Sequence, residues 1–325
     1  MCNLVSQGFK TGSCLTKTCE KELPACESTL RIEEGKIFRL IKSAHLSRPE
    51  HYFSLYQSGC NFSCLKCHSW EFSQIASGDW MSCDDILELA KGYEILVTFE
   101  ERKERVTSFH AQDLCHSCGS CISGERSKNC PGLLKPEQII LSPQGFGPAR
   151  NIFAFTGGDL TCCPEFYTEC TQLIKKHTNL FILIETNGYG LTHENLDILK
   201  KAGVDSFWLD VKAYDGKIHK KLTGCSNEGI LKLPREIHER GFVLEILSLY
   251  IPEWVEKNQI KKIAELTLSV SEDIPFTILA YFPCYKMKVR PPSLSEMIET
   301  YRIVKDVGLK NVRLGNLGVC TGRNE

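Results

Sequence analysis

Seven short apolar runs recur along the chain, each rich in β-branched and aromatic residues. Near-continuous apolar runs of this length are typical of strands buried on both faces of a sheet, and amphipathic patterns with helical spacing lie between most of them. Strands are expected at 51–57, 151–156, 180–186, 206–211, 242–251, 275–282 and 311–316. Helices are expected at positions that include 164–177, 193–203, 253–269 and 293–308, with stop signals at Gly203, Gly241 and Gly308.

The alternation of strands and helices predicts βα units and a parallel sheet. About six or seven such units predict an α/β fold of the barrel type. We expect a partial (β/α)6-type TIM barrel with an additional C-terminal strand over residues 51–320. Residues 1–50 precede the pattern as an N-terminal extension that contains cysteines, and residues 100–150 interrupt the first crossover as a cysteine-rich insert.

Composition limits the partners and the cellular location that this protein can be expected to have. The chain has 325 residues, of which 42% are hydrophobic and 24% charged, and a net charge of −1. These values are typical of a globular protein and give no reason to expect a nucleic-acid partner. No apolar run nears the roughly 18 residues of a membrane span, and the first residues lack a signal-peptide core. We therefore expect a cytoplasmic protein without a membrane partner, in which 18 cysteines favour metal binding over disulfides.

Distinctive polar residues follow several of the expected strands. TGGD (156–159) follows the second strand, ETNG (185–188) closes the third and DVK (210–212) closes the fourth. The carboxyl ends of parallel barrel strands share one mouth, where active sites lie. Ordinary turn chemistry is the alternative, because Gly, Asn and Asp end strands in many proteins. The coincidence of several such motifs favours a shared site.

Three cysteines stand on one short loop after the first expected strand. Cys60, Cys64 and Cys67 have the spacing Cys-x-x-x-Cys-x-x-Cys, and the next cysteine is Cys83. Three thiolates can hold three corners of an iron–sulfur cube, whose full cysteine ligation would need four. The fourth iron would then be open to an outside ligand, as catalytic metal sites keep an open position.

At this loop the sequence resembles the radical S-adenosylmethionine superfamily, whose signature is Cys-x-x-x-Cys-x-aromatic-Cys. The resemblance runs from about residue 52 to residue 320 outside the insert. It implies a 4Fe–4S cluster on the three cysteines, with S-adenosylmethionine as the outside ligand. Lys66 stands where the family has an aromatic residue that packs against adenine. His68 and Trp70 are the candidate substitutes, with loop packing as the alternative for Trp70.

Further motifs resemble the pyruvate formate-lyase activating enzyme branch, whose members make glycyl radicals. TGGDL resembles the superfamily's Gly-Gly-Glu-Pro stretch, and ETNG and DVKAYD resemble motifs of that branch. The resemblance implies a site for S-adenosylmethionine and a cation that is formed by Gly157, Gly158, Asp159, Glu185, Thr186, Asn187, Asp210 and Lys212. Asp210 and Lys212 are also the catalytic candidates. A plain ion pair between them is the alternative, because residues two apart on a strand face the same side.

The insert supplies a second candidate metal site. Its cysteines run Cys-x-x-Cys-x-x-Cys-x8-Cys-Pro, at Cys115, Cys118, Cys121 and Cys130. This pattern looks like half of a bacterial ferredoxin motif with a stretched last spacing. We interpret it as the ligand set of an auxiliary 4Fe–4S cluster, with a structural zinc ion as the competing interpretation.

The other cysteines give less specific patterns. A further metal site is one interpretation of Cys14, Cys19 and Cys26. Roles as spare ligands, radical partners or core thiols are open for Cys162 and Cys163, and roles are also open for Cys284 and Cys320. Packing inside the protein is expected for Cys83, Cys170 and Cys225.

The resemblance implies reductive cleavage of S-adenosylmethionine to a 5′-deoxyadenosyl radical, which abstracts hydrogen from a carbon of a protein or peptide substrate. It also implies a low-potential electron donor such as ferredoxin or flavodoxin. The first alternative is a cobalamin-dependent radical C-methyltransferase that acts on a protein residue. Against it, we expect no appended cobalamin domain after the seventh strand, and the sequence has no Asp-x-His-x-x-Gly loop. The second alternative is a non-catalytic iron–sulfur or zinc protein.

Overall fold

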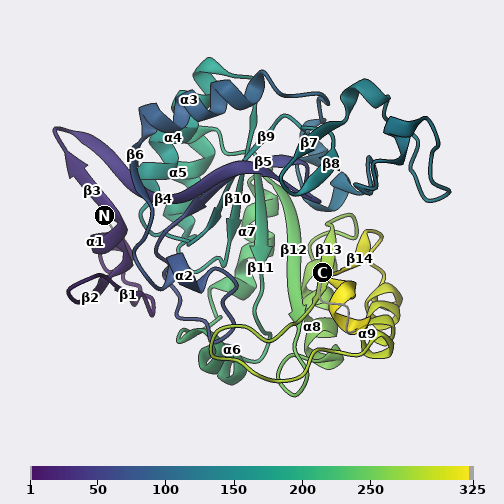
Figure 1. Cartoon of the computed structure of the whole chain (residues 1–325). Helices are drawn as coiled ribbons and strands as arrows, with labels where there is room; N and C mark the ends of the chain where they lie inside the picture. The colour runs from purple at the N-terminus through teal and green to yellow at the C-terminus, as the bar shows by residue number, and fades with distance from the viewer. Residues whose placement is uncertain (1, 322–325) are drawn as a thin grey trace.

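One large curved sheet forms the centre of the protein, in a computed structural model that describes residues 2–321 (Figure 1). Seven of its strands are parallel and stand side by side in chain order. They are β5 (Tyr52–Gln57), β9 (Ile152–Gly157), β10 (Phe181–Thr186), β11 (Ser206–Asp210), β12 (Val243–Tyr250), β13 (Phe276–Ala280) and β14 (Val312–Gly315). Because β5 and β14 do not pair with each other, the sheet stays open. The expected partial TIM barrel with an additional C-terminal strand is thereby confirmed.

The seven parallel strands are those expected from the apolar runs, with ends that differ by at most two residues. In β9, for example, four consecutive side chains, Ile152 to Phe155, are completely buried. Successive side chains of a strand point to opposite faces, so both faces of this strand are covered.

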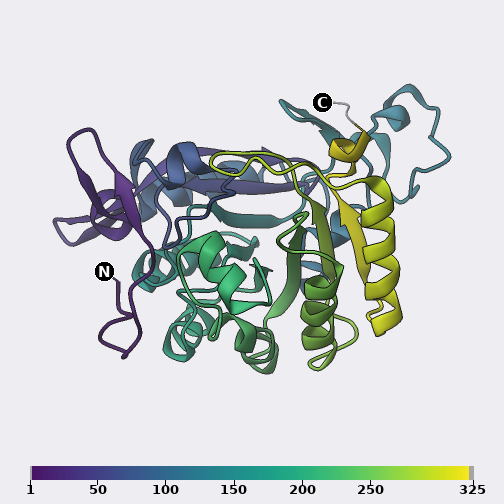
Figure 2. The same ribbon diagram turned by 90° about the horizontal axis from the view of Figure 1, so that it is seen from below.

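Helices cover the outer face of the sheet (Figure 2). They are α3 (Cys83–Glu94), α4 (Pro164–His177), α5 (His193–Ala202), α6 (Gly216–Thr223), α7 (Leu233–Glu239), α8 (Lys257–Leu268) and α9 (Leu294–Val307). Helices α5 and α9 end at Gly203 and Gly308, whose φ angles of 101° and 115° are left-handed, as the stop signals predict. Helix α8 begins later than the expected residue 253, because Ile251 and Val255 form a β-bridge before it. No helix within residues 2–321 has the length and apolarity needed to cross a membrane.

The N-terminal part of the chain extends the sheet beyond β5, which the sequence analysis did not anticipate. Strand β4 (Lys36–Ser47) pairs antiparallel with β5, and β3 (Leu30–Glu33) and β6 (Asp79–Ser82) pair with β4. An irregularity in register between Ile41 and Ser43 interrupts the alternation of β4, as a β-bulge does. The short elements nearby are β1 (Leu15–Lys17), β2 (Glu22–Pro24), α1 (Ala25–Thr29) and α2 (Trp70–Ser73).

The insert attaches at the amino end of β5, whereas the three-cysteine loop follows its carboxyl end. It contains a hairpin of β7 (Ile140–Ser142) and β8 (Gly145–Gly147). Just before β5, Arg48 donates hydrogen bonds to the carbonyl oxygens of Gly147 and Pro148, and the His51 ring lies 3.3 Å from the carbonyl oxygen of Cys115. Strand β5 has six residues and a length of about 20 Å. The insert and the three-cysteine loop therefore lie at opposite ends of the barrel.

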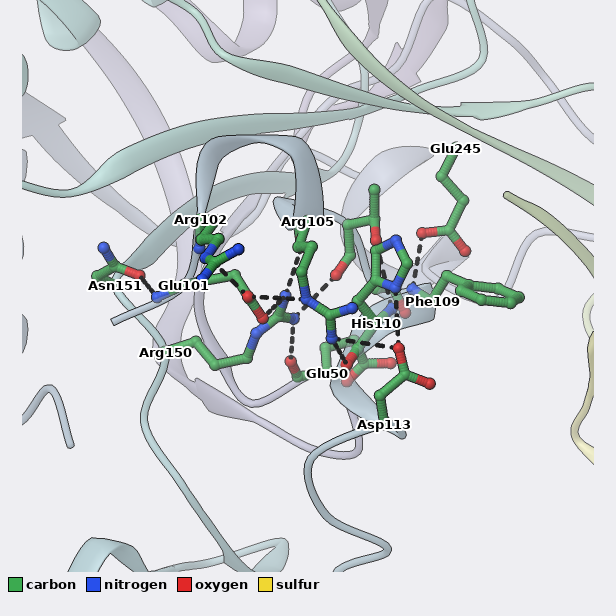
Figure 3. A network of polar contacts seen from close by, with 12 residues as sticks. Glu50, Glu101, Arg102, Arg105, Phe109, His110, Asp113, Arg150, Asn151 and Glu245 are labelled. Carbon is green, nitrogen blue, oxygen red and sulfur yellow. Dashed lines mark hydrogen bonds and ion pairs between the residues drawn. The ribbon is translucent and has the colours of Figure 1, made fainter. Parts of the chain in front are cut away.

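A buried ion pair joins the two ends of the insert, just before β9 (Figure 3). The side chain of Arg150 is completely buried, and its Nη2 lies 3.0 Å from Oε2 of Glu101. Arg150 also donates hydrogen bonds to the carbonyl oxygens of Arg105 and Thr107. The side chain of Arg105 in turn donates from Nε to Oε1 of Glu101 at 3.0 Å. The two charges are thus paired and hydrogen-bonded, as buried charges need to be.

Replacing Glu101 by Ala should leave the buried guanidinium of Arg150 without its counter-charge. We expect the free energy of unfolding to fall by about 3–5 kcal/mol, measured by urea denaturation. Lys257→Ala is the matched control, because it breaks an exposed ion pair with Glu299 and should cost less than about 1 kcal/mol. Equal losses in the two variants would contradict the structural role of the Glu101 pair.

Candidate active site

The three-cysteine loop, residues 58–67, is held by a buried arginine from β4. Nη2 of Arg39 donates to the carbonyl oxygens of Ser58 at 2.8 Å, Gly59 at 3.2 Å and Gly158 at 3.3 Å. The side chain of Arg39 has no exposed surface. One guanidinium therefore sets the position of both the three-cysteine loop and the TGGD loop.

The glycines of these two loops allow their backbones to touch. A Cβ atom on Gly158 would lie 2.1 Å from the carbonyl oxygen of Gly59, a distance that no side chain tolerates. Gly59 itself has a left-handed φ of 77°, and a Cβ there would meet Thr29 at 2.5 Å. Glycine adopts this conformation without a steric penalty, so the close approach of the loops depends on both residues.

A cavity of about 620 Å³ opens at the carboxyl ends of the strands, within the size range of ligand sites. All three cysteines of the loop line it. The predicted strand-end residues that also line it are Gly157, Asp159, Glu185, Thr186, Asn187, Asp210 and Lys212. Gly158 lies behind them, against the three-cysteine loop. An adjacent cavity of about 380 Å³ shares Cys64, Asp210 and Lys212 with the first. The structure thus gathers the predicted site residues around one mouth.

The cysteines of the loop lie in a protected environment. Burial raises the pKa of Cys60 to about 12 and also raises the pKa of Cys64. The backbone N–H of Phe62 and Nδ2 of Asn187 approach Cys60 Sγ at 3.5 and 3.6 Å. These thiols hold their protons until a metal displaces them, and N–H donors to the sulfur atoms would then tune a bound cluster.

Within residues 2–321, no three His, Cys, Asp or Glu side chains are arranged to hold a single metal ion. A mononuclear zinc ion draws four ligands to one point. Ligands of a 4Fe–4S cube differ, because each thiolate binds a different iron. A set of three cysteines therefore suits a cluster with one open iron rather than a structural zinc ion, which needs four ligands.

The carboxylate of Asp159 joins the loops that follow β9 and β10. Oδ1 accepts hydrogen bonds from N and Oγ1 of Thr161, both at 2.8 Å. Oδ2 accepts from Oγ1 of Thr186 at 2.7 Å and from N of Asn187 at 2.9 Å. The carbonyl oxygen of Asp159 accepts from N of Asn61, which carries the network into the three-cysteine loop. Asp159 thus positions the other residues of the mouth.

Glu185 points into the barrel below the mouth. Its carboxyl group accepts hydrogen bonds from Tyr52 Oη at 2.8 Å and from Thr156 Oγ1 at 2.6 Å. Burial raises the pKa of Glu185 to about 8, although the two hydrogen bonds act in the opposite direction. At neutral pH this carboxyl group therefore holds a proton.

Asp210 and Lys212 form the ion pair that was the alternative interpretation of DVK. Both side chains remain about a quarter exposed and line both cavities. Burial lowers the pKa of Lys212, but attraction to Asp210 and Cys64 outweighs this effect and the net change is upward. The pair does not exclude a ligand, because Oδ1 of Asp210 is buried and has no hydrogen-bond partner in the described chain.

Trp208 is a lining residue that the sequence analysis did not identify. It lies two residues before Asp210 on β11, so both side chains face the cavity. Its Nε1 is buried and, within residues 2–321, has no acceptor. Buried polar groups are normally paired, so Nε1 of Trp208 and Oδ1 of Asp210 fit a bound polar ligand. The strand alternation was the signal that could have identified Trp208.

Aromatic surface at the mouth comes from another strand end. Phe282 follows β13 and lines the smaller cavity, with Nζ of Lys66 3.8 Å from its ring centroid. The His68 ring meets Phe282 edge-on at 5.5 Å and lines both cavities. Trp70 stacks on Tyr285 at 5.1 Å, as loop packing predicts. Phe282 and His68 therefore supply aromatic surface beside Lys66.

The insert cysteines line neither cavity. Cys115, Cys121 and Cys130 are half-buried and Cys118 is exposed. Cys284 places its thiol 3.3 Å from the carbonyl oxygen of Cys67 but lines neither cavity.

The packing thiols are buried as expected. Cys83 and Cys170 touch between α3 and α4, and Cys225 accepts a hydrogen bond from N of Ser13. Cys320 is half-buried near the described C-terminal end.

Comparison with known proteins shows which family this chain is similar to. Residues 115–267 match the family model of the radical SAM superfamily, so the resemblance read from the motifs is confirmed. The matched stretch contains β9 to β12 but begins after the three-cysteine loop, whose role rests on its spacing and position.

The more specific likeness is to an activating enzyme. A protein from Methanocaldococcus jannaschii, provisionally named a glycyl-radical enzyme activating enzyme, is 36% identical over 129 residues. That match covers 38% of this chain and 48% of the relative, so it spans about half of the relative's length.

Two solved structures are similar at low identity. A domain of the pyruvate-formate lyase-activating enzyme from Bacteroides vulgatus is 24% identical, with a TM-score of 0.44 over 50% of this chain and 98% of that one. SuiB from Streptococcus suis is 16% identical, with a TM-score of 0.48 over 82% of this chain and 49% of that one.

The raised pKa of Glu185 predicts a pH dependence of stability. An unfolded Glu titrates near about 4.3, whereas the folded carboxyl holds its proton up to about pH 8. The folded state therefore binds the extra proton, and stability falls as pH rises from about 4 through about 8. Glu185→Gln cannot ionise, and its amide can accept from one of the two hydroxyl groups through Oε1 and donate to the other through Nε2. We expect the wild type to lose on the order of a few kcal/mol relative to this variant between pH 5 and pH 9.

Urea denaturation of both proteins across this pH range measures the difference. Glu299→Gln, an exposed carboxyl, controls for the loss of one acid. Parallel stability curves for the wild type and Glu185→Gln would show that Glu185 is ionised in the folded protein throughout.

Proposed function

We propose that this protein is a radical S-adenosylmethionine enzyme of the activating-enzyme type, which cleaves S-adenosylmethionine reductively and abstracts hydrogen from a carbon of a protein or peptide substrate. One observation carries the proposal: three cysteines from one loop line the cavity at the carboxyl ends of the barrel strands. Active sites of parallel barrels lie at this end. The superfamily match supports the reaction class, and the activating-enzyme relative supports the substrate class.

The donor set of the cavity fits a 4Fe–4S cluster with one open iron. Cys60, Cys64 and Cys67 supply three thiolates, and Cys284 is held on the backbone of Cys67 instead of facing the cavity. Such a cluster, when bound, would supply the electron for cleavage and an iron for the amino and carboxylate groups of S-adenosylmethionine.

The residues of the chain would hold the ligand and exclude water. Oδ1 of Asp210 can accept from an ammonium group, and Nε1 of Trp208 can donate to an oxygen, because both atoms lack partners in residues 2–321. Lys212 supplies a positive charge beside Asp210. Leu247 adds an apolar wall to both cavities, which limits the solvent available to a reactive intermediate.

The insert is a separate element of the proposal. We infer that Cys115, Cys118, Cys121 and Cys130 bind an auxiliary 4Fe–4S cluster near the amino end of β5. Burial raises the pKa of Cys115, and the charges of Cys121 and Cys118 act in the same direction. The exposure of Cys118 would give a low-potential electron donor access to this end of the barrel.

Replacing Cys60, Cys64 and Cys67 together by Ala tests the assignment of the catalytic cluster. Anaerobically reconstituted variant protein should form no 5′-deoxyadenosine from S-adenosylmethionine under reduction, whereas the wild type forms it. The variant should still bind about four irons per chain if the insert holds a cluster. Product analysis by liquid chromatography and iron analysis give the two results.

The matched control replaces the insert residues Cys118 and Cys121 by Ala. We expect this variant to lose the second iron complement and to retain 5′-deoxyadenosine formation when a chemical reductant supplies electrons. Undiminished product from the variant without Cys60, Cys64 and Cys67 would remove that loop from the active site.

Asp210→Asn tests whether the mouth binds the charged end of S-adenosylmethionine. The change removes the negative charge but keeps the shape of the side chain. The dissociation constant for S-adenosylmethionine should rise at least about tenfold, roughly 1.4 kcal/mol, while the iron content stays constant. Equilibrium dialysis with labelled ligand measures the affinity. Asp197→Asn on α5, an exposed residue paired with Arg240, is the control, and an equal affinity in both variants would leave Asp210 as an ion-pair residue only.

A further inference from the structure

Part of the N-terminal extension packs directly against the three-cysteine loop. We call residues 10–17 the strap. A Cβ atom on Gly12 would lie 2.1 Å from the carbonyl oxygen of Asn61, and Oγ of Ser13 lies 2.5 Å from Oγ of Ser63. Asn61 and Ser63 line neither cavity, whereas the three cysteines of the loop do. The strap therefore lies on the side of the loop that is turned away from the cavity.

The first half of the strap is anchored to two other loops of the barrel. Oη of Tyr189, in the loop after β10, donates to the carbonyl oxygens of Lys10 and Thr11, both at 3.2 Å. The backbone N–H of Ser13 donates to Sγ of Cys225, just after α6, at 3.1 Å. The contacts of Gly12 and Ser13 with the three-cysteine loop are therefore held in place from outside that loop.

The second half of the strap is anchored to the segment that follows α2. The backbone N–H of Lys17 donates to the carbonyl oxygen of Gln74 at 2.9 Å, and the carbonyl oxygen of Lys17 accepts from N of Ala76 at 2.8 Å. Nε2 of Gln74 donates in turn to the carbonyl oxygen of Phe62 at 2.9 Å. The strap thus holds the three-cysteine loop both by direct contact and through Gln74.

Other elements hold the same loop from different sides. Arg39 binds its first carbonyl groups from the sheet. At the end of α6, the carbonyl oxygen of Thr223 accepts from N of Ser63 at 3.1 Å, and that of Leu222 accepts from N of Leu65 at 2.8 Å. The strap adds contacts from the N-terminal extension, a part of the chain outside the parallel barrel.

We propose that the strap keeps the three-cysteine loop in the conformation that presents Cys60, Cys64 and Cys67 to the cavity, and thereby slows the escape of metal from the loop. This inference rests on the proposed function, because it concerns the metal that these thiolates would hold. Ordering a loop costs conformational entropy, and a ligand set that is ordered beforehand binds more tightly. Opening of the loop would carry the thiolates away from a bound cluster.

Hydrogen exchange of metal-free, full-length protein tests the positioning role. Gly12→Ala adds one carbon atom that must push the strap away from Asn61, whereas the same change at Gly229 meets no atom within 4 Å and is the matched control. We expect amide exchange of residues 58–67 to be at least about tenfold faster in Gly12→Ala than in Gly229→Ala. Exchange in α8 and α9 should equal that of the wild type in both variants.

Iron retention tests the consequence for the metal. Replacing the four insert cysteines by Ala restricts the measurement to iron on the three-cysteine loop. In this background, Gly12→Ala should lose iron to a ferrous chelator faster than Gly229→Ala does, as followed by absorbance. A background protein that takes up no iron would overturn the proposed function, and the exchange result would still decide whether the strap positions the loop.

Circular dichroism verifies that Gly12→Ala is folded. Ser13→Ala, which removes the hydroxyl contact with Ser63 without adding volume, takes its place if it is not. Unchanged exchange of residues 58–67 in a folded strap variant would overturn the proposal, and so would an equal acceleration in every part of the chain. Faster exchange of the loop without faster iron loss would overturn the claim that the strap retains the metal.

Discussion

The buried carboxylate of Asp159 is the interaction on which the mouth of the barrel depends. Its two oxygens accept four hydrogen bonds from Thr161, Thr186 and Asn187. A buried charge is costly unless such partners surround it, and hydrogen bonds to a charged group contribute about 1.5–3 kcal/mol each. The loops after β9 and β10 are therefore fixed relative to each other before any ligand binds.

This constraint reaches the cysteines through Asn187 and Arg39. Nδ2 of Asn187 bonds to Asn61 at 2.7 Å and approaches the sulfur atom of Cys60. Arg39 donates hydrogen bonds to the carbonyl oxygens of Ser58, Gly59 and Gly158. The backbone of the loop is thus bound to Arg39, and the cysteine side chains face the cavity. Nε1 of Trp208 and Oδ1 of Asp210 have no hydrogen-bond partner in the described chain. Unpaired atoms of this kind are expected in a preorganised ligand site, because the ligand supplies their partners.

The sequence predicted the parts of the structure that depend on local pattern. Apolar runs identify the seven parallel strands because these are buried on both faces, and parallel geometry then gathers TGGD, ETNG and DVK at one end. Strand β4 escaped prediction because its register irregularity breaks the alternation. The role of Arg39 in holding the three-cysteine loop could not be predicted either, because the sequence does not distinguish a buried arginine from an exposed one. The contact of Asn3 with the backbone of Cys162 depends on the return of the N-terminal segment, which the sequence pattern does not indicate. The placement of the insert at the amino end of β5 likewise depends on tertiary structure.

The central claim is that Cys60, Cys64 and Cys67 hold a cluster whose open iron binds S-adenosylmethionine. Its most direct test is the EPR spectrum of reduced protein in which the four insert cysteines are replaced by Ala, recorded before and after S-adenosylmethionine is added. The account predicts the signal of one reduced 4Fe–4S cluster, with g values that shift when the ligand coordinates to the open iron. A protein without a cluster signal, or a signal that S-adenosylmethionine leaves unchanged, would contradict it.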